Sequence, residues 1–183
     1  GMTTETKSMM IAGVGGQGTL LASKVLGSLF TKAGCDVKVS EIHGMSQRGG
    51  SVVTYVRWGQ QVWSPLVDRG EADYLLAFEL CEAARWCSYL RPDGVLIANT
   101  QKILPMPVIT GAAEYPQNVE ETLRRSCKDP ILVDALTLVL GGRADKSLIR
   151  TGADRARVEA LFDIAGNREA QEILEEWGLE SDQ

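Results

Sequence analysis

The sequence of 183 residues lacks clustered cysteines. Its four cysteines, Cys35, Cys81, Cys87 and Cys127, are scattered, and the closest pair has five residues between its members. Iron–sulfur and zinc-ribbon motifs need tighter paired spacings, because one loop must supply two ligands. We therefore predict ordinary reduced thiols, no metal site on this chain and a cytoplasmic location.

Long apolar runs and an excess of positive charge are also missing. No run approaches the ~20 apolar residues of a membrane span. The 19 basic and 24 acidic residues give a net charge of −5, and the acidic excess lies in residues 101–183. A nucleic-acid or anionic-membrane partner would require a basic face, so we expect neither. Residues 1–7 lack the regions of a signal peptide and are predicted to be a disordered tail, with Gly1 before Met2 typical of a cloning scar.

From residue 8 onward, short apolar runs alternate with helical stretches, which predicts βαβ units. The fold class is α/β: a three-layer, Rossmann-like, mainly parallel sheet with an antiparallel hairpin insertion and a C-terminal helical pair, all within one domain of residues 8–183. The hairpin is predicted to join strand 51–58 to residues 61–63 across a turn at 59–60. The other strands are expected at 8–13, 36–41, 74–79, 95–99 and 131–134, with a weak one at 108–109, and helices at 17–33, 82–90 and 118–127.

Two amphipathic patterns bear on packing. In helix 17–33, Leu21, Val25 and Leu29 recur on one face, and Leu26, Phe30 and Ala33 lie beside them. Near the C-terminus, two further helical stripes predict a docked helical hairpin over residues 151–183. Trp58, Trp63 and Trp86 are interpreted as core residues.

The first candidate site is the glycine loop after the first strand. Glycines permit close backbone approach, and the amides that open the next helix can bind a phosphate. Glu41 stands where a ribose-binding acid would be expected, which favours NAD or FAD. The alternative is a tight turn used for packing or a subunit contact, which is supported by the hairpin that replaces the second crossover helix. The residues of this loop are Gly13, Gly15, Gly16, Gln17 and Gly18.

The second candidate site is the loop at residues 41–50. His43, the only histidine, is a candidate general base beside Glu41. Arg48 could hold a carboxylate or phosphate in a bidentate manner. The alternative is a turn or a rigid surface that matches a partner. The remaining residues of this loop that we assign to an anion or interface site are Ser46, Gln47, Gly49 and Gly50.

Together these residues resemble a known family. The strings at residues 12–18, 41–53, 64–66 and 72–76, above all His-Gly-Met-Ser-Gln-Arg-Gly-Gly, are similar to the gamma-type subunits or domains of 2-oxoacid:ferredoxin oxidoreductases. Within that family the resemblance is strongest to the beta subunits of the indolepyruvate enzymes. The C-terminus departs from it, because a Gly-Asn-Arg string appears only at residues 166–168.

The resemblance implies a heteromeric enzyme that decarboxylates a 2-oxoacid, such as indolepyruvate or pyruvate, to an acyl-CoA and passes electrons to ferredoxin. Thiamine diphosphate, Mg, iron–sulfur clusters and CoA would be held in the assembled complex by large catalytic subunits, and none tightly by this chain. The isolated chain would be inactive and could form a homodimer. Both loops would lie on the CoA side or at an interface. A stand-alone NAD- or FAD-binding oxidoreductase or sensor, and a repurposed scaffold, are the alternatives.

Overall fold

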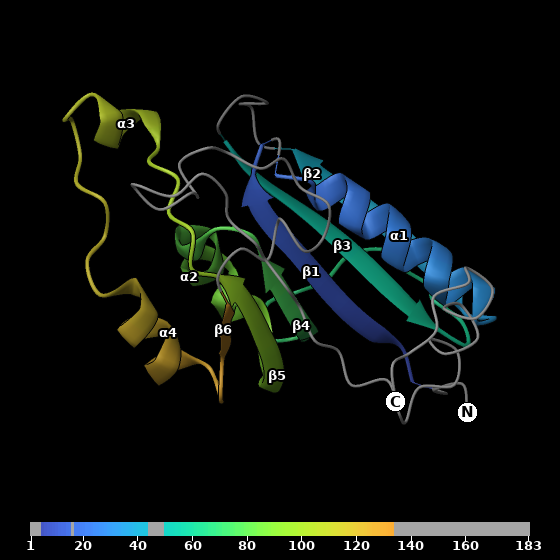
Figure 1. Cartoon of the computed structure of the whole chain (residues 1–183). Coiled ribbons are helices and arrows are strands. Elements are labelled where there is room, and N and C mark those ends of the chain that lie inside the picture. Colours follow the sequence, from blue (N-terminus) through green and yellow to red (C-terminus); the bar gives the residue numbers. More distant parts are fainter. Residues whose placement is uncertain (1–4, 16, 44–49, 134–183) are drawn as a thin grey trace, which may run out of the picture.

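The computed structural model describes residues 5–15, 17–43 and 50–133. These residues form one six-stranded sheet in the order β2-β3-β1-β4-β5-β6, with helices beside it (Figure 1). The elements are β1 Lys7–Val14, α1 Thr19–Lys32, β2 Asp36–His43, β3 Ser51–Gly59, β4 Ala72–Ala77, α2 Leu80–Trp86, the short 3₁₀ helix η1 Cys87–Tyr89, β5 Leu90–Asn99, α3 Met106–Ile109, α4 Val119–Ser126 and β6 Ile131–Val133.

Strand direction confirms the mixed sheet. β1, β4, β5 and β6 are parallel neighbours, whereas β3 runs antiparallel to both β1 and β2. After β1 the chain passes through α1 to β2, at one edge of the sheet. After β4 it passes through α2 to β5, on the side of the other edge. The carboxyl ends of β1 and β4 therefore flank the topological switch point, where open α/β sheets usually bind ligands.

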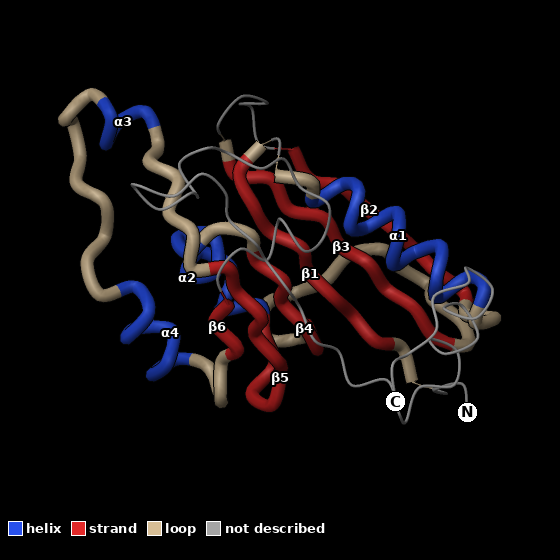
Figure 2. Tube along the Cα trace, viewed as in Figure 1, coloured by secondary structure: helices blue, strands red, loops and turns tan. Residues whose placement is uncertain are grey.

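Side-chain alternation along β1 confirms the three layers. Met10 and Ala12 belong to a core cluster that includes Leu80 and Ala83 of α2. Ile11, which points to the opposite face, belongs to a second cluster, packed against Leu26 and Phe30 of α1. Because successive strand residues face opposite sides, α1 and α2 cover opposite faces of the sheet (Figure 2).

The predicted hairpin at residues 61–63 is wrong. β3 instead lies between β2 and β1 and pairs with each over eight residues, while residues 61–63 form a loop. The Asp36 carboxylate accepts a hydrogen bond from the Val62 amide at 2.8 Å and so holds this loop against β2. Trp63 is 86% exposed and is not a core residue, whereas Trp58 is buried and stacks on Phe30 with ring centroids 4.1 Å apart.

Three local predictions also change. The weak strand at 108–109 is the short helix α3, because a proline in the first helical turn presets a helical φ. β5 begins at Leu90, so the turn predicted at residues 92–94 lies inside the strand, where its register with β4 shifts. β1 begins at Lys7, a residue that was predicted to belong to the disordered tail.

Helix α1 faces the sheet with Leu26, Phe30 and several small residues. Thr19, Ser23 and Gly27 are buried, and a Cβ at Gly27 would lie 3.5 Å from a methyl of Val39. The stripe of Leu21 and Val25 points outward instead, with Leu21 54% exposed. The predicted stripe of Leu21, Val25 and Leu29 thus lies on the outer surface, and the neighbouring Leu26 and Phe30 pack against the sheet.

The tail at residues 1–4 and the predicted helical hairpin at 151–183 lie outside the described residues. Among the helices that the structure describes, none has both the length and the apolar character needed to span a membrane.

Candidate functional site

The glycine loop connects the carboxyl end of β1 to α1. Gly18 precedes the helix with a φ of 90°, a left-handed conformation that favours glycine. Gly13 is packed tightly, because an added Cβ would lie 2.9 Å from Thr19 Cγ2 and 3.4 Å from Phe78 Cβ. Close packing of α1 onto the ends of β1 and β4 therefore explains Gly13, and the left-handed backbone explains Gly18.

Three backbone donors of this loop are engaged within the protein. The Val14 amide donates to Gln17 Oε1 at 2.7 Å, and the Gln17 amide donates to the Val14 carbonyl at 3.1 Å. The Gly15 amide donates to the Gly50 carbonyl at 3.0 Å. A phosphate would have to compete for these three amides. The contacts favour a structural brace over a nucleotide cradle.

The Gln17 side chain also crosses the switch point. Its Nε2 donates to the Phe78 carbonyl at 2.9 Å, while its Oε1 accepts from the Val14 amide. One side chain thus connects the end of β1 to the residue that follows β4. The crevice in which such sheets usually hold a ligand is spanned here by a protein group.

The structure brings the two sequence motifs together. Gly50, the last residue of the second loop, contacts the glycine loop through Gly15. Ser51, the first residue of β3, donates a short hydrogen bond to the Glu82 carboxylate on α2. Glu82 is buried and also accepts from Trp86 Nε1 and Arg85 Nε, each at 3.2 Å. The returning end of the second loop is therefore anchored to both β1 and α2.

Glu79 is a buried carboxylate that our sequence reasoning missed. It is 1% exposed and caps α2 by accepting from the Glu82 amide at 2.9 Å. Its Oε1 accepts from the Ile103 amide at 3.2 Å and from the Tyr115 hydroxyl at 2.6 Å. The available signal was an acid directly after an apolar strand with Glu82 three residues later, the spacing of a capping box.

Tyr115 keeps its proton in this cluster. Burial is the main cause that raises the pKa of the Tyr115 hydroxyl, and its contacts with Cys81 and Glu79 raise it further. The hydroxyl is therefore a donor to Glu79 at neutral pH. The cluster joins α2 to two chain segments that follow β5.

The end of β5 is connected to the same edge. Asn99 is fully buried, and its Nδ2 donates to the Phe78 carbonyl at 3.3 Å and to Gln101 Oε1 at 3.2 Å. The Leu80 amide donates to the Gln101 carbonyl at 3.0 Å. The carboxyl ends of β1, β4 and β5 thus form one polar network in which protein groups pair with protein groups.

Glu41 lies away from the glycine loop. β3 separates β2 from β1, so Glu41 is two strand spacings of about 4.8 Å from β1. A ribose-binding acid stands on the strand next to the glycine loop in the dinucleotide fold. His43 is the last residue of β2, in register with Val52. The His43 side chain, Gly16, Ser46, Gln47, Arg48 and Gly49 lie outside what the structure describes.

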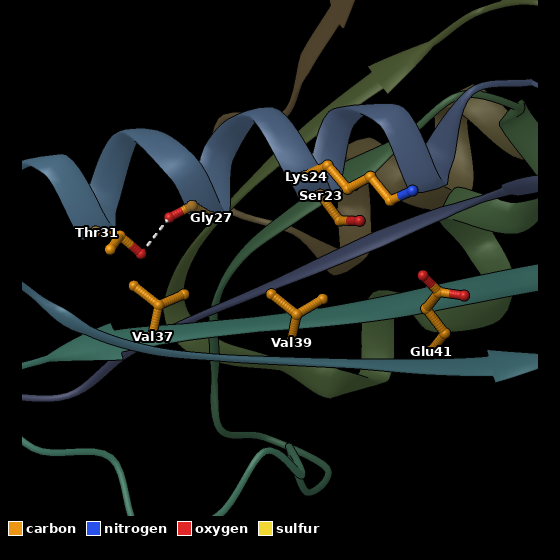
Figure 3. Close-up of a pocket in the computed structure, with 7 residues that line it drawn as sticks. All are labelled: Ser23, Lys24, Gly27, Thr31, Val37, Val39 and Glu41. Carbon is orange, nitrogen blue, oxygen red and sulfur yellow. Dashed lines mark hydrogen bonds between the residues drawn. The ribbon is translucent and has the colours of Figure 1, made fainter.

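Glu41 instead borders a groove between α1 and β2. The groove has a volume of about 650 Å³. Figure 3 shows the Glu41 side chain pointing from β2 toward α1, on the side where Lys24 lies, with Val37 and Val39 along the strand. The residues that line it are Ser23, Lys24, Gly27, Thr31, Val37, Val39 and Glu41.

Comparison with known proteins places this fold in a family. A family model described as pyruvate ferredoxin/flavodoxin oxidoreductase matches residues 8–153. The chain is 47% identical over 117 residues to the indolepyruvate oxidoreductase subunit IorB of Pyrococcus horikoshii, which covers 64% of this chain and 57% of that protein. It is 47% identical over 109 residues to IorB of Thermococcus kodakarensis, which covers 60% of this chain and 54% of that protein. The chain thus spans little more than half the length of these relatives.

A solved structure agrees on the fold. Pyruvate oxidoreductase subunit PORC from Thermotoga maritima superposes with a TM-score of 0.53 at 20% identity, over 75% of this chain and 66% of that one. At this identity the likeness concerns the fold alone. Because the family model matches well over half of the residues, the chain belongs to the pyruvate ferredoxin/flavodoxin oxidoreductase family.

Proposed function

We propose that this chain is a subunit of a 2-oxoacid ferredoxin oxidoreductase that acts on indolepyruvate or another arylpyruvate. In the assembled enzyme the 2-oxoacid is oxidatively decarboxylated to an acyl-CoA and the electrons pass to ferredoxin. The observation that carries the proposal is the 47% identity to two proteins named indolepyruvate oxidoreductase subunit IorB. We also propose that the enzyme is cytoplasmic.

We assign the cofactors of this reaction to partner subunits. When bound there, thiamine diphosphate with Mg supplies decarboxylation, and iron–sulfur clusters carry the electrons. The described residues do not fit these groups: no three His, Cys, Asp or Glu side chains among residues 5–15, 17–43 and 50–133 gather as a metal-binding set. The amides of Val14, Gly15 and Gln17 are paired with protein acceptors. No catalytic step is assigned to this chain's own residues.

The role of the chain is to present its second loop to the partner. The Gly15–Gly50 and Ser51–Glu82 hydrogen bonds anchor the returning end of that loop. His43 and Arg48, within or beside this loop, supply groups suited to an anionic substrate or to the CoA phosphates. The proposal therefore places residues 43–49 at the interface that completes the active site.

The outer face of α1 supports a subunit role. Leu21, Val25 and Leu29 are exposed on it. Exposed apolar side chains gathered on one helix face are typical of a protein interface. We assign it to the large catalytic subunit, since the relatives are themselves named as subunits.

Co-expression with a large thiamine-dependent subunit tests the proposal. The purified complex, assayed without oxygen, is expected to reduce ferredoxin with indolepyruvate and CoA faster than with pyruvate, and the isolated chain is expected to be inactive. Turnover by the isolated chain would contradict the subunit role. A complex that prefers pyruvate would contradict only the substrate class.

A matched pair of variants tests the α1 surface. Leu21→Asp is expected to weaken assembly, whereas Leu104→Asp, an exposed leucine in the segment between β5 and α3, is expected to leave it intact. Equal assembly of both variants would exclude the α1 face as the interface. A concentration-dependent dimer of the isolated chain that Leu21→Asp abolishes would instead assign this face to a second copy.

A further inference from the structure

Two cysteines that are far apart in the sequence lie side by side in the fold. Cys87 begins η1 directly after α2, and Cys127 follows the last residue of α4, forty positions later. Helices α2 and α4 pack against each other over the same face of the sheet. Both cysteines line a small cavity of about 220 Å³ beside β5, and the neighbouring Cys87 is one cause of the raised pKa of the Cys127 thiol.

The other two cysteines have different surroundings. Cys35 packs against the second core cluster, on the opposite face of the sheet. The Cys81 thiol interacts with the Tyr115 hydroxyl. All four are partly buried free thiols, so Cys35 and Cys81 serve as internal controls for Cys87 and Cys127.

The chemistry around the pair separates the roles of its two thiols. Burial, and then the neighbouring Cys87, raise the pKa of the Cys127 thiol to about 11. The Cys87 thiol donates to the Ala84 carbonyl at 3.2 Å. Because the thiolate is the reactive form, the raised pKa makes Cys127 a slow nucleophile at neutral pH.

We propose that Cys87 and Cys127 are a site of reversible oxidation that forms an intramolecular disulfide, with a peroxide as the oxidant. The Cys87 thiol loses its proton, and the thiolate attacks an oxygen of hydrogen peroxide. The O–O bond breaks, the leaving hydroxide takes up that proton, and a sulfenic acid and one water result. The Cys127 sulfur then attacks the sulfenic sulfur, the S–S bond forms, and a second water leaves with the Cys127 proton. The two thiols lose two electrons and two protons, and the peroxide gains them.

The disulfide would join the end of α2 to the end of α4 across β5 and α3. Closing a loop of about forty residues restricts the unfolded chain, so oxidation is expected to raise the unfolding temperature by roughly 5–10 °C. This inference concerns the fold of the chain and does not depend on the proposed activity.

The test is thiol mapping of the full chain after treatment with hydrogen peroxide. Remaining thiols are blocked with N-ethylmaleimide, and the peptides are identified by mass spectrometry without reduction. We expect two of the four thiols to be lost and a linked pair of peptides carrying Cys87 and Cys127, reversed by dithiothreitol. The oxidation rate should rise with pH, because the thiolate fraction rises.

Variants separate the pair from general oxidation. Cys35→Ser and Cys81→Ser should still form the linked peptides and show the rise in unfolding temperature, and Cys87→Ser and Cys127→Ser should lose both. A substitution near the core can itself impair folding. The thiol map of the unsubstituted chain therefore decides whether the Cys87–Cys127 disulfide forms. Peptides linked through Cys35 or Cys81, disulfides between chains, or Cys87 oxidised to sulfinic acid without a linked partner would each overturn the proposal.

Discussion

Replacing Gln17 with leucine tests the brace across the switch point. The substitution keeps a side chain of similar size but removes the acceptor for the Val14 amide, at 2.7 Å, and the donor to the Phe78 carbonyl, at 2.9 Å. The Phe78 carbonyl keeps a second donor in Asn99, so the main loss is the unpaired Val14 amide. An unpaired, partly buried amide costs about 1–3 kcal/mol.

For a chain of this size, that loss lowers the unfolding temperature by roughly 3–8 °C. Chemical and thermal denaturation measure it, and hydrogen exchange at the Val14 amide provides a local readout that should become faster. Gln60→Leu is the matched control, because Gln60 is exposed and its replacement is expected to change stability by less than about 0.5 kcal/mol. If Gln17→Leu and Gln60→Leu unfold alike and the Val14 exchange rate is unchanged, the brace has no energetic role.

Three further predictions address the same edge of the sheet. Tyr115→Phe removes the 2.6 Å hydrogen bond to the buried Glu79 carboxylate and should lower the free energy of unfolding by about 1.5–3 kcal/mol, whereas Tyr89→Phe should change it less. Calorimetric titration with NAD, NADP and FAD should show no binding, and a saturable isotherm would restore the stand-alone oxidoreductase. Arg48→Ala should reduce the activity or assembly of the complex more than the unfolding free energy of the chain; an unchanged complex with an unchanged rate would reject this role.

The alternation of strands and helices and the position of both loops could be predicted from the sequence. Alternating apolar runs and helical stretches determine a βαβ order, and loops after β1 and β2 must emerge at the carboxyl edge of a parallel sheet. The comparisons confirm the family, whose signature strings were recognised in the two loops. These features depend on local patterns, which a single sequence contains.

The pairing of β3 could not be predicted, because it depends on a competition between distant strands. A short turn after residue 58 favours a local hairpin, but insertion between β2 and β1 pairs β3 on both of its edges. The orientation of α1 also depends on a contact between distant segments, the packing of the helix against β2. Ser23 and Gly27 allow the helix to approach β2 closely, and this turns the larger Leu21 outward.

The polar network also limits what can bind at the switch point. A ligand there would have to displace Gln17 from two backbone partners, at a cost of about 1 kcal/mol for each net hydrogen bond, before it gained any contact of its own. A partner that docks against the second loop or the α1 face displaces neither bond. The same glycines that permit a phosphate cradle in a dinucleotide fold permit close packing here, as the 2.9 Å approach at Gly13 shows. Glycine spacing alone is therefore a weak guide to nucleotide binding.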